Sequence, residues 1–219
     1  MDALGPAAVL DLWDHGGRLV PAERALMALS LAGIDAGERT VGERDAALLA
    51  LHAATYGGSL AGVTDCPACG ESLDVDVPTA HLAVDPPTAG ARSIEIADDV
   101  LSFRLPTAAD VAAARDADEL FERCVNATAT AGVRDEIEAL MALSDPGAEL
   151  EVALTCAACG EEWIEVLDPV RFFWSATVGA ARSVSEDVGV LARAYGWSER
   201  EVLAMSGRRR ELYLEALNR

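Results

Sequence analysis

Four of the five cysteines fall into two short segments that could share one metal ion. The segment "CPACG" holds Cys66 and Cys69, and "CAACG", far downstream, holds Cys156 and Cys159. In each segment two residues separate the cysteines and a glycine follows, which suits a tight turn that points both sulfurs at one centre. A tetrahedral zinc ion needs four ligands, so neither segment is sufficient alone. We therefore predict one closed, structural Zn²⁺ site made of all four thiolates.

The long separation of the two cysteine pairs does not argue against this site. Comparable zinc motifs place the second pair about 15–20 residues after the first. The extra loop-closure entropy here is only ~1.4 kcal/mol, whereas structural zinc binding contributes roughly 10–16 kcal/mol in peptides. The sequence thus predicts a split zinc ribbon, with the intervening residues folded as an insertion.

A dithiol redox pair is the main alternative chemistry for these segments. Such a pair normally lies at the start of a helix in a β-α-β context. Here both segments precede residues with strand character, "ESLDVDV" and "EEWIEVL", and glycine stands where a haem attachment motif needs histidine. The zinc interpretation is favoured, and a dithiol redox protein remains the lesser alternative.

The other candidate residues favour structural roles. Cys124 lies on a predicted helical stripe and is expected to be a small buried hydrophobe, and His52 lies on an apolar helix face, where we expect it in the core. The sequence contains no phosphate-binding glycine loop, no serine elbow and no metal motif with a spare carboxylate. We expect no enzymatic activity and no small-molecule substrate.

Composition and charge exclude several classes of partner. The chain has 37 acidic and 17 basic residues, a formal charge of −20, and all its basic residues are arginine. Such a charge repels phosphate backbones, so we expect no nucleic acid. The longest uncharged run, residues 46–64, contains turn residues unsuited to a bilayer span, and the N-terminus lacks the basic region of a signal peptide. We expect a soluble, cytoplasmic protein with no membrane partner.

The only basic run lies near the C-terminus, at Arg208, Arg209 and Arg210. These side chains could pair locally with Glu201 or Glu211, which is the simpler interpretation. The alternative is a docking point for the acidic surface of a partner.

Hydrophobic patterning predicts a mainly helical α+β chain, with helices at both ends flanking the split ribbon. Each cysteine pair with its flanking strands is called a knuckle. Five segments are expected: an N-terminal helical region (1–57), the first knuckle and a loop (58–90), an inserted β-hairpin and helices (91–148), the second knuckle (149–167) and a C-terminal helical region (168–219).

Local signals mark the helix ends within these segments. Thr107 followed by Asp110 can form a capping box, and Asp168 followed by Pro169 can begin the longest helix, which Gly196 then ends. The long apolar stripe of that helix requires a partner, either another helix of this chain or another subunit.

Further segments stand out when the sequence is taken as a whole: "VLDLWDHG" and "PAERAL" near the N-terminus, "RLPTAAD" after the predicted hairpin, and "LARAYGWSEREVLAMSGRRRELYLEAL" near the C-terminus. Together with the two knuckles, they resemble the base-plate protein family of T-even contractile phages and phage-tail-like contractile injection systems. The resemblance implies a non-enzymatic structural component or assembly factor of a base plate, which acts through contacts with other tail or base-plate proteins. It also implies that the protein can be incorporated into a phage-tail-like particle.

The resemblance implies that the four cysteines of the two knuckles are zinc ligands. The second knuckle departs from the common form because Ala157 replaces proline, which should loosen the turn without removing a ligand. In the C-terminal segment, Trp197, Arg209, Arg210 and Tyr213 belong to the matching motif, and with Arg208 they are the candidate partner-binding residues. A zinc-ribbon adaptor of another macromolecular assembly is the alternative function.

Overall fold

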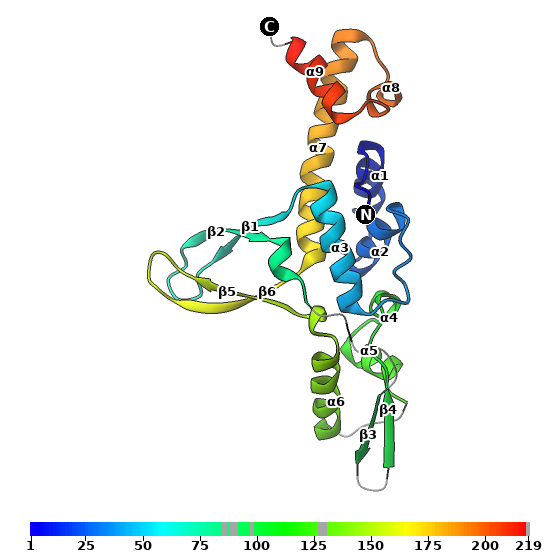
Figure 1. Ribbon diagram of the computed structural model, residues 1–219, viewed down its shortest axis with the longest axis vertical. Coiled ribbons are helices and arrows are strands. Elements are labelled where there is room, and N and C mark those ends of the chain that lie inside the picture. The colour runs from blue at the N-terminus through cyan, green and yellow to red at the C-terminus, as the bar shows by residue number, and fades with distance from the viewer. Residues whose placement is uncertain (85–86, 88–91, 97–98, 127–130, 218–219) are drawn as a thin grey trace.

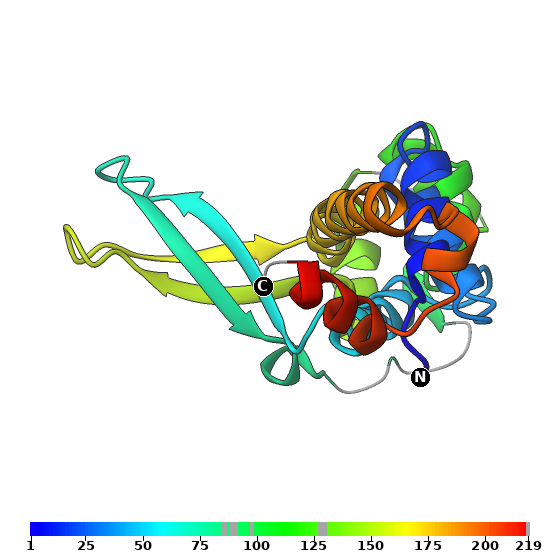
Figure 2. The same cartoon turned by 90° about the horizontal axis from the view of Figure 1, so that it is seen from above.

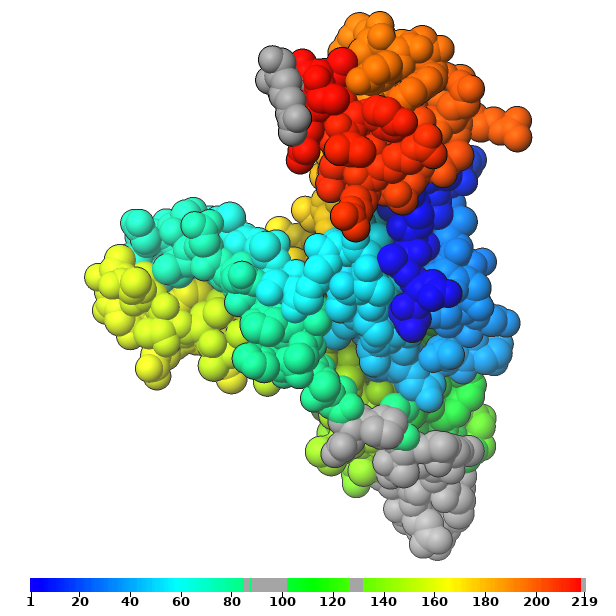
Figure 3. All heavy atoms as spheres, turned by 45° about the horizontal axis from the view of Figure 1, so that its top comes forward, coloured from blue at the N-terminus to red at the C-terminus, as the bar shows by residue number. Residues whose placement is uncertain are grey.

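The chain forms a helical body from which an arm of two β-hairpins projects (Figure 1), and the space-filling view shows the same arm standing out from the body (Figure 3). The computed structural model describes residues 1–84, 87, 92–96, 99–126 and 131–217. The body consists of α1 (Pro6–Gly16), α2 (Pro21–Leu31), α3 (Val41–Thr55) and the long α7 (Pro169–Tyr195). The arm consists of β1 (Ser59–Asp65), β2 (Ser72–Pro78), β5 (Leu150–Thr155) and β6 (Glu162–Leu167). The prediction of a mainly helical chain with strands beside the cysteines is confirmed.

The insertion and the C-terminal helices lie at opposite ends of the body (Figure 1). A short helix, η1 (Thr79–Leu82), follows β2 at the base of the arm, where Leu82 packs with Leu60 and Val77. The insertion contains β3 (Arg92–Ile96), β4 (Asp99–Phe103), α4 (Ala108–Ala113), α5 (Ala117–Cys124), α6 (Ala131–Ser144) and η2 (Pro146–Ala148). The C-terminal helices are α8 (Glu199–Leu203) and α9 (Gly207–Leu217). Strands β3 and β4 pair antiparallel, as the sequence predicts, and residues 97–98 between them lie outside the described residues.

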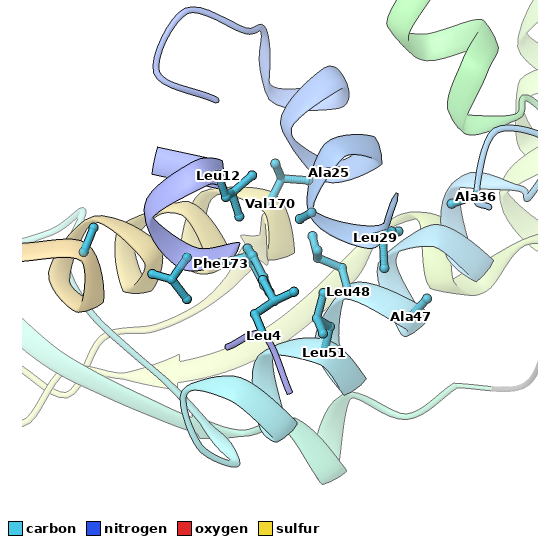
Figure 4. Packing of buried hydrophobic residues seen from close by; sticks show 13 residues of the cluster. Leu4, Leu12, Ala25, Leu29, Ala36, Ala47, Leu48, Leu51, Val170 and Phe173 are labelled. Carbon is cyan, nitrogen blue, oxygen red and sulfur yellow. The ribbon is translucent and has the colours of Figure 1, made fainter. Parts of the chain in front are cut away.

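The main core lies where α1, α2, α3 and α7 meet (Figure 4). Leu12, Leu29 and Leu51 are completely buried there, and Phe173 reaches in from α7. Helices α8 and α9 pack against the other end of α7. The apolar stripe of α7 is therefore covered by helices of this same chain.

The arm has its own small core where the hairpins join the body. Each hairpin is a two-stranded antiparallel sheet, and Leu60 pairs with Val77 as Leu150 pairs with Leu167. These four side chains pack together with Leu49 of α3. The two hairpins consequently project together from the body, and in the view from above the first hairpin crosses over the second (Figure 2).

The predicted helix ends are confirmed in detail. The Thr107 amide donates to the Asp110 carboxylate at 2.9 Å, and the Asp110 amide donates to the Thr107 hydroxyl at 3.2 Å, which completes the capping box of α4. At α7 the Val170 amide donates to Asp168 Oδ1 at 2.9 Å. Gly196 ends that helix with φ 71°, a left-handed conformation that glycine adopts without strain.

Candidate metal centre

The two hairpins carry the cysteines at their far ends, away from the body. In the first hairpin Asp65 pairs with Ser72, and the loop between them contains Cys66 and Cys69. In the second hairpin the last pair is Thr155 with Glu162, and its loop holds Cys156 and Cys159. The strands therefore fix the direction of each loop, and the shared core at the base brings the two loops together.

Both loops have the same backbone conformation. The Cys66 amide donates to the Glu71 carbonyl at 2.9 Å, and the Gly70 amide donates back to the Cys66 carbonyl at 2.9 Å. The second loop repeats these bonds, from Cys156 to Glu161 at 2.8 Å and from Gly160 to Cys156 at 2.9 Å. The glycines have φ angles of 72° and 79°, so the glycine that ends each sequence motif is required by the turn.

The four cysteine sulfurs converge on one point. The Sγ atoms of Cys66 and Cys159 are 3.7 Å apart, those of Cys69 and Cys156 are also 3.7 Å apart, and all four lie within 4.8 Å of one another. A disulfide would need about 2.05 Å, and these cysteines are free. Four sulfurs bound tetrahedrally at about 2.3 Å from one metal ion lie about 3.8 Å apart. The cluster therefore fits a four-coordinate metal ion.

The environment of the thiols also suits a bound cation. Burial raises the pKa of Cys66, but hydrogen bonds from the backbone at Cys69 and Ala68 and from the neighbouring thiols outweigh it and lower the pKa to about 7. For Cys159 the backbone hydrogen bond at Glu161 lowers the pKa, but the crowding thiols and burial outweigh this and raise it to about 12. Four sulfurs this close cannot all ionise unless a cation offsets their repulsion.

The C-terminal candidate residues form an aromatic cluster rather than a second metal site. Trp197 stacks on Tyr195 with ring centroids 4.5 Å apart, and its ring meets the edge of Tyr213 at 4.8 Å. The guanidinium of Arg209 lies 5.7 Å from the centre of the Tyr213 ring. Trp197 and Tyr213 are half-buried, so part of each ring faces solvent.

The three consecutive arginines occupy different environments. Arg208 and Arg209 are exposed, whereas Arg210 is 8% exposed and its Nε lies 3.5 Å from Asp187 Oδ2 of α7. The local partner of the run is thus Asp187, not Glu201 or Glu211. Only Arg208 and Arg209 present their charge to solvent.

The remaining cysteine and one histidine have the structural roles expected from the sequence. Cys124 is 5% exposed and packs with Phe103 and Ile137. His52 is 5% exposed, its ring meets the edge of Phe173, and its Nδ1 hydrogen-bonds the Gly57 carbonyl at 3.1 Å. Neither residue contributes to the metal centre.

Sequence reasoning missed a groove at the base of the arm. It has a volume of about 320 Å³ and lies between β1, β6 and the first turns of α7, with Phe172 among its lining residues. The sequence signal for this groove was Val63 and Val166, two apolar residues that share a strand face with acidic residues and are exposed in the structure. Sequence reasoning did not single them out, because it expected apolar and acidic residues to alternate regularly between the two faces.

Among the residues that the structure describes, the four cysteines form the group that could hold a metal ion. Within the same residues, the helices lack a stretch with the length and hydropathy needed to cross a membrane.

Comparison with known proteins yields one family. A family model described as T4 bacteriophage base plate protein matches residues 30–174, which is more than half of the chain. The match includes both hairpins, all four cysteines, the insertion and the start of α7, and the C-terminal segment with the aromatic cluster lies outside it. No curated protein and no solved structure matches the chain.

Proposed function

Because the chain belongs to the T4 bacteriophage base plate protein family, we propose that it is a non-enzymatic structural component or assembly factor of the base plate of a contractile tail or phage-tail-like contractile injection system. It acts by binding other tail or base-plate proteins. It is made in the cytoplasm and can be incorporated into the particle. The observation that carries this proposal is the family match, which spans the whole arm and its cysteine cluster.

The metal that we propose for the cluster is one structural Zn²⁺ per chain. An all-thiolate, four-coordinate set is typical of structural zinc. Cys66, Cys69, Cys156 and Cys159 would hold the ion and leave no position for a substrate. Its role is to fasten the ends of the two hairpins to each other, so that the arm keeps one shape when other proteins bind.

The C-terminal helices provide the proposed contact with an acidic surface of a partner. Arg208 and Arg209 are exposed on α9, beside the half-buried rings of Trp197 and Tyr213. Arginine and aromatic side chains are enriched at the energetic centres of protein interfaces. Arg210 supports this surface from inside through its ion pair with Asp187.

Native mass spectrometry of the full-length protein tests the metal. We expect one zinc per chain in the wild type and none in Cys156→Ser, because three thiolates and a hydroxyl bind zinc far more weakly. Cys124→Ala is the matched control, since it removes a buried cysteine outside the cluster and should retain the zinc. A metal-free wild type with paired disulfides would support the dithiol redox alternative instead.

Deletion of the gene in the host bacterium tests the base-plate function. Electron microscopy should then show tubes and sheaths without complete base plates, and the wild-type gene should restore them. Complete base plates in the deletion strain would contradict the proposal and favour an adaptor in another assembly.

A further inference from the structure

The groove at the base of the arm is bordered by two free strand edges. In the described residues each hairpin is a separate two-stranded sheet, so β1 pairs only with β2, and β6 only with β5. Consecutive residues 61–64 of β1 and 165–167 of β6 line the groove, whereas β2 and β5 contribute only the alternate residues Val75, Val152 and Leu154. Since successive side chains of a strand point to opposite faces, a run of consecutive residues means that the groove meets β1 and β6 edge-on.

The inner end of this groove is closed by α7. Phe172 packs directly on the backbone of β1, where a Cβ on Gly62 would come 2.8 Å from its ring. Glycine at position 62 thus lets the helix approach the strand closely. The groove consequently has an aromatic side chain at its inner end and a strand edge along each side.

The edges carry acidic residues, such as Glu165, but no basic residue and no proline, so the charge on them repels acidic strands and not basic ones. Proline and bulges also block strand addition. Neither β1 nor β6 contains a proline, and Val63 and Val166 beside the groove are 63% and 55% exposed. An exposed apolar strand edge of this kind can accept another strand.

Charge defines the kind of strand that fits. Residues 59–78 and 149–168 carry ten acidic residues and no basic residue. Glu165 and Asp168 line the groove itself, and Arg171 of α7 is the one basic residue among its lining. A segment with alternating basic and aliphatic residues would place its apolar side chains against Val63 and Val166 and its charges near the carboxylates.

From these observations, we propose that the groove between β1 and β6 binds an extended, basic segment of another protein by strand addition. Backbone hydrogen bonds to the free edge give affinity, and the acidic arm selects lysine- or arginine-containing sequences. This surface is separate from the C-terminal contact, and its partner has the opposite charge. The inference does not rest on the base-plate function, so its failure would leave that proposal unchanged, but it requires the ordered arm that the proposed metal maintains.

Selection from a random library of displayed dodecapeptides on the full-length protein tests the inference. We expect enrichment of peptides in which arginine or lysine alternates with valine, isoleucine or leucine. Each enriched peptide is then synthesised and titrated against the wild type and three variants. Val63→Arg and Val166→Arg should weaken binding at least tenfold, because each places a positive charge in the groove and removes an apolar contact.

Ile164→Arg is the matched control. Ile164 lies on the same strand as Val166 and is 63% exposed, but it does not line the groove. It should change the affinity less than threefold, which separates a specific site from general attraction to an acidic protein. Circular dichroism melts of the three variants verify that all remain folded.

Strand addition also predicts sensitivity to the peptide backbone. Methylation of alternate backbone nitrogens on the side that faces the protein should abolish binding, whereas methylation on the opposite side should preserve it. The inference is overturned if no peptides are enriched, if the enriched peptides are acidic or uncharged, or if Val63→Arg and Val166→Arg bind them as the wild type does. A dimer that dissociates in Val166→Arg would also overturn it, because the occupant would then be a second copy of this chain.

Discussion

The carboxylate of Asp145 accepts a hydrogen bond from the Gly42 amide at 2.9 Å, across 103 positions of sequence. This bond fastens the end of the insertion to the first turn of α3. The Asp145 side chain is buried, and its Oδ1 has no hydrogen-bond partner in the structure. The close approach is possible because Gly42 has no side chain, and a Cβ there would overlap Oδ1 and come 2.9 Å from the Gly147 carbonyl carbon.

Gly42→Ala should therefore destabilise the protein by about 1–3 kcal/mol, as overpacking of a tight contact does. Urea unfolding followed by circular dichroism measures the loss. Gly179→Ala is the control: position 179 is an exposed site within α7 with no atoms near a new Cβ. That variant should gain roughly 0.5–1 kcal/mol from helix propensity. Equal effects of the two substitutions would contradict the packing described here.

Removal of the metal ion that we propose for the four cysteines should disorder the arm but leave the helical body folded. Trp163 lies on β6 and donates from Nε1 to Glu165 at 3.0 Å, so its fluorescence reports on the arm. A strong chelator should shift this emission, and the far-ultraviolet helix signal should change little because the main core contains no arm residue. In Trp163→Phe the emission shift should disappear. Loss of the helix signal together with the emission would show that arm and body unfold as one unit.

The Arg104–Asp110 ion pair should stabilise the protein at neutral pH. Hydrogen bonds from Arg104 lower the pKa of Asp110, and hydrogen bonds from the Thr107 amide and hydroxyl lower it further. Burial raises the pKa, but the hydrogen bonds outweigh it and hold the pKa well below its usual range. The folded state therefore keeps this carboxylate ionised where the unfolded state takes up a proton. Its contribution is complete above about pH 4 and is lost as the pH falls further.

Asp110→Asn should accordingly cost about 1–2 kcal/mol at pH 7, a modest value because the Arg104 side chain is 43% exposed. The difference in unfolding free energy between this variant and the wild type should shrink between pH 4 and pH 2. A difference that is independent of pH would mean that the carboxylate charge does not contribute.

Asp45 should have the opposite dependence on pH. Burial raises the pKa of Asp45 to about 6, although the neighbouring Arg44 guanidinium, 2.7 Å away, lowers it. Asp168 and Asp145 raise it further. The folded state binds the proton more tightly than the unfolded state, so stability falls as the pH rises from about 4 to about 6 and stays lower above that.

Urea unfolding at pH 5 and pH 7 measures this effect. The wild type should lose roughly 1 kcal/mol more than Asp45→Asn over that interval. The comparison with the variant removes the general effect of a chain with a net charge of −20, which also changes with pH. Parallel pH profiles would show that Asp45 titrates normally.

The consecutive arginines should separate into two classes. Arg210→Ala should destabilise the protein, because Asp187 would lose its partner in a largely buried site. Arg208→Glu and Arg209→Glu should leave the melting temperature unchanged and weaken any complex with an acidic partner. If Arg208→Glu and Arg209→Glu left the affinity for the acidic partner unchanged, their proposed role in docking would be wrong.

Local features of this chain could be predicted from its sequence because their causes are local. The capping box at Thr107 and Asp110, the helix start at Asp168 and the glycine stop at Gly196 each depend on side chains within a few residues. The convergence of the cysteines could also be predicted, because a tetrahedral site requires four ligands and two similar loops supply two each.

Other features could not be predicted, because they depend on the packing of distant segments. Nothing near Gly42 in the sequence indicates that Asp145 approaches it, and nothing near Arg210 identifies Asp187 as its partner. The groove was missed for the same reason, since β1 and β6 become neighbours only after the hairpins join the body.

The sulfurs of Cys69 and Cys156 end 3.7 Å apart but are 87 positions apart in the chain. A ribosome that adds about 5–20 residues per second needs roughly 4–17 s to pass from the first to the second. During this interval the first hairpin has emerged with two thiols and an apolar face that the second hairpin does not yet cover. The arm is thus completed only after the insertion has been synthesised, and in that interval the nascent chain is most open to premature pairing and to loss of its thiols by oxidation.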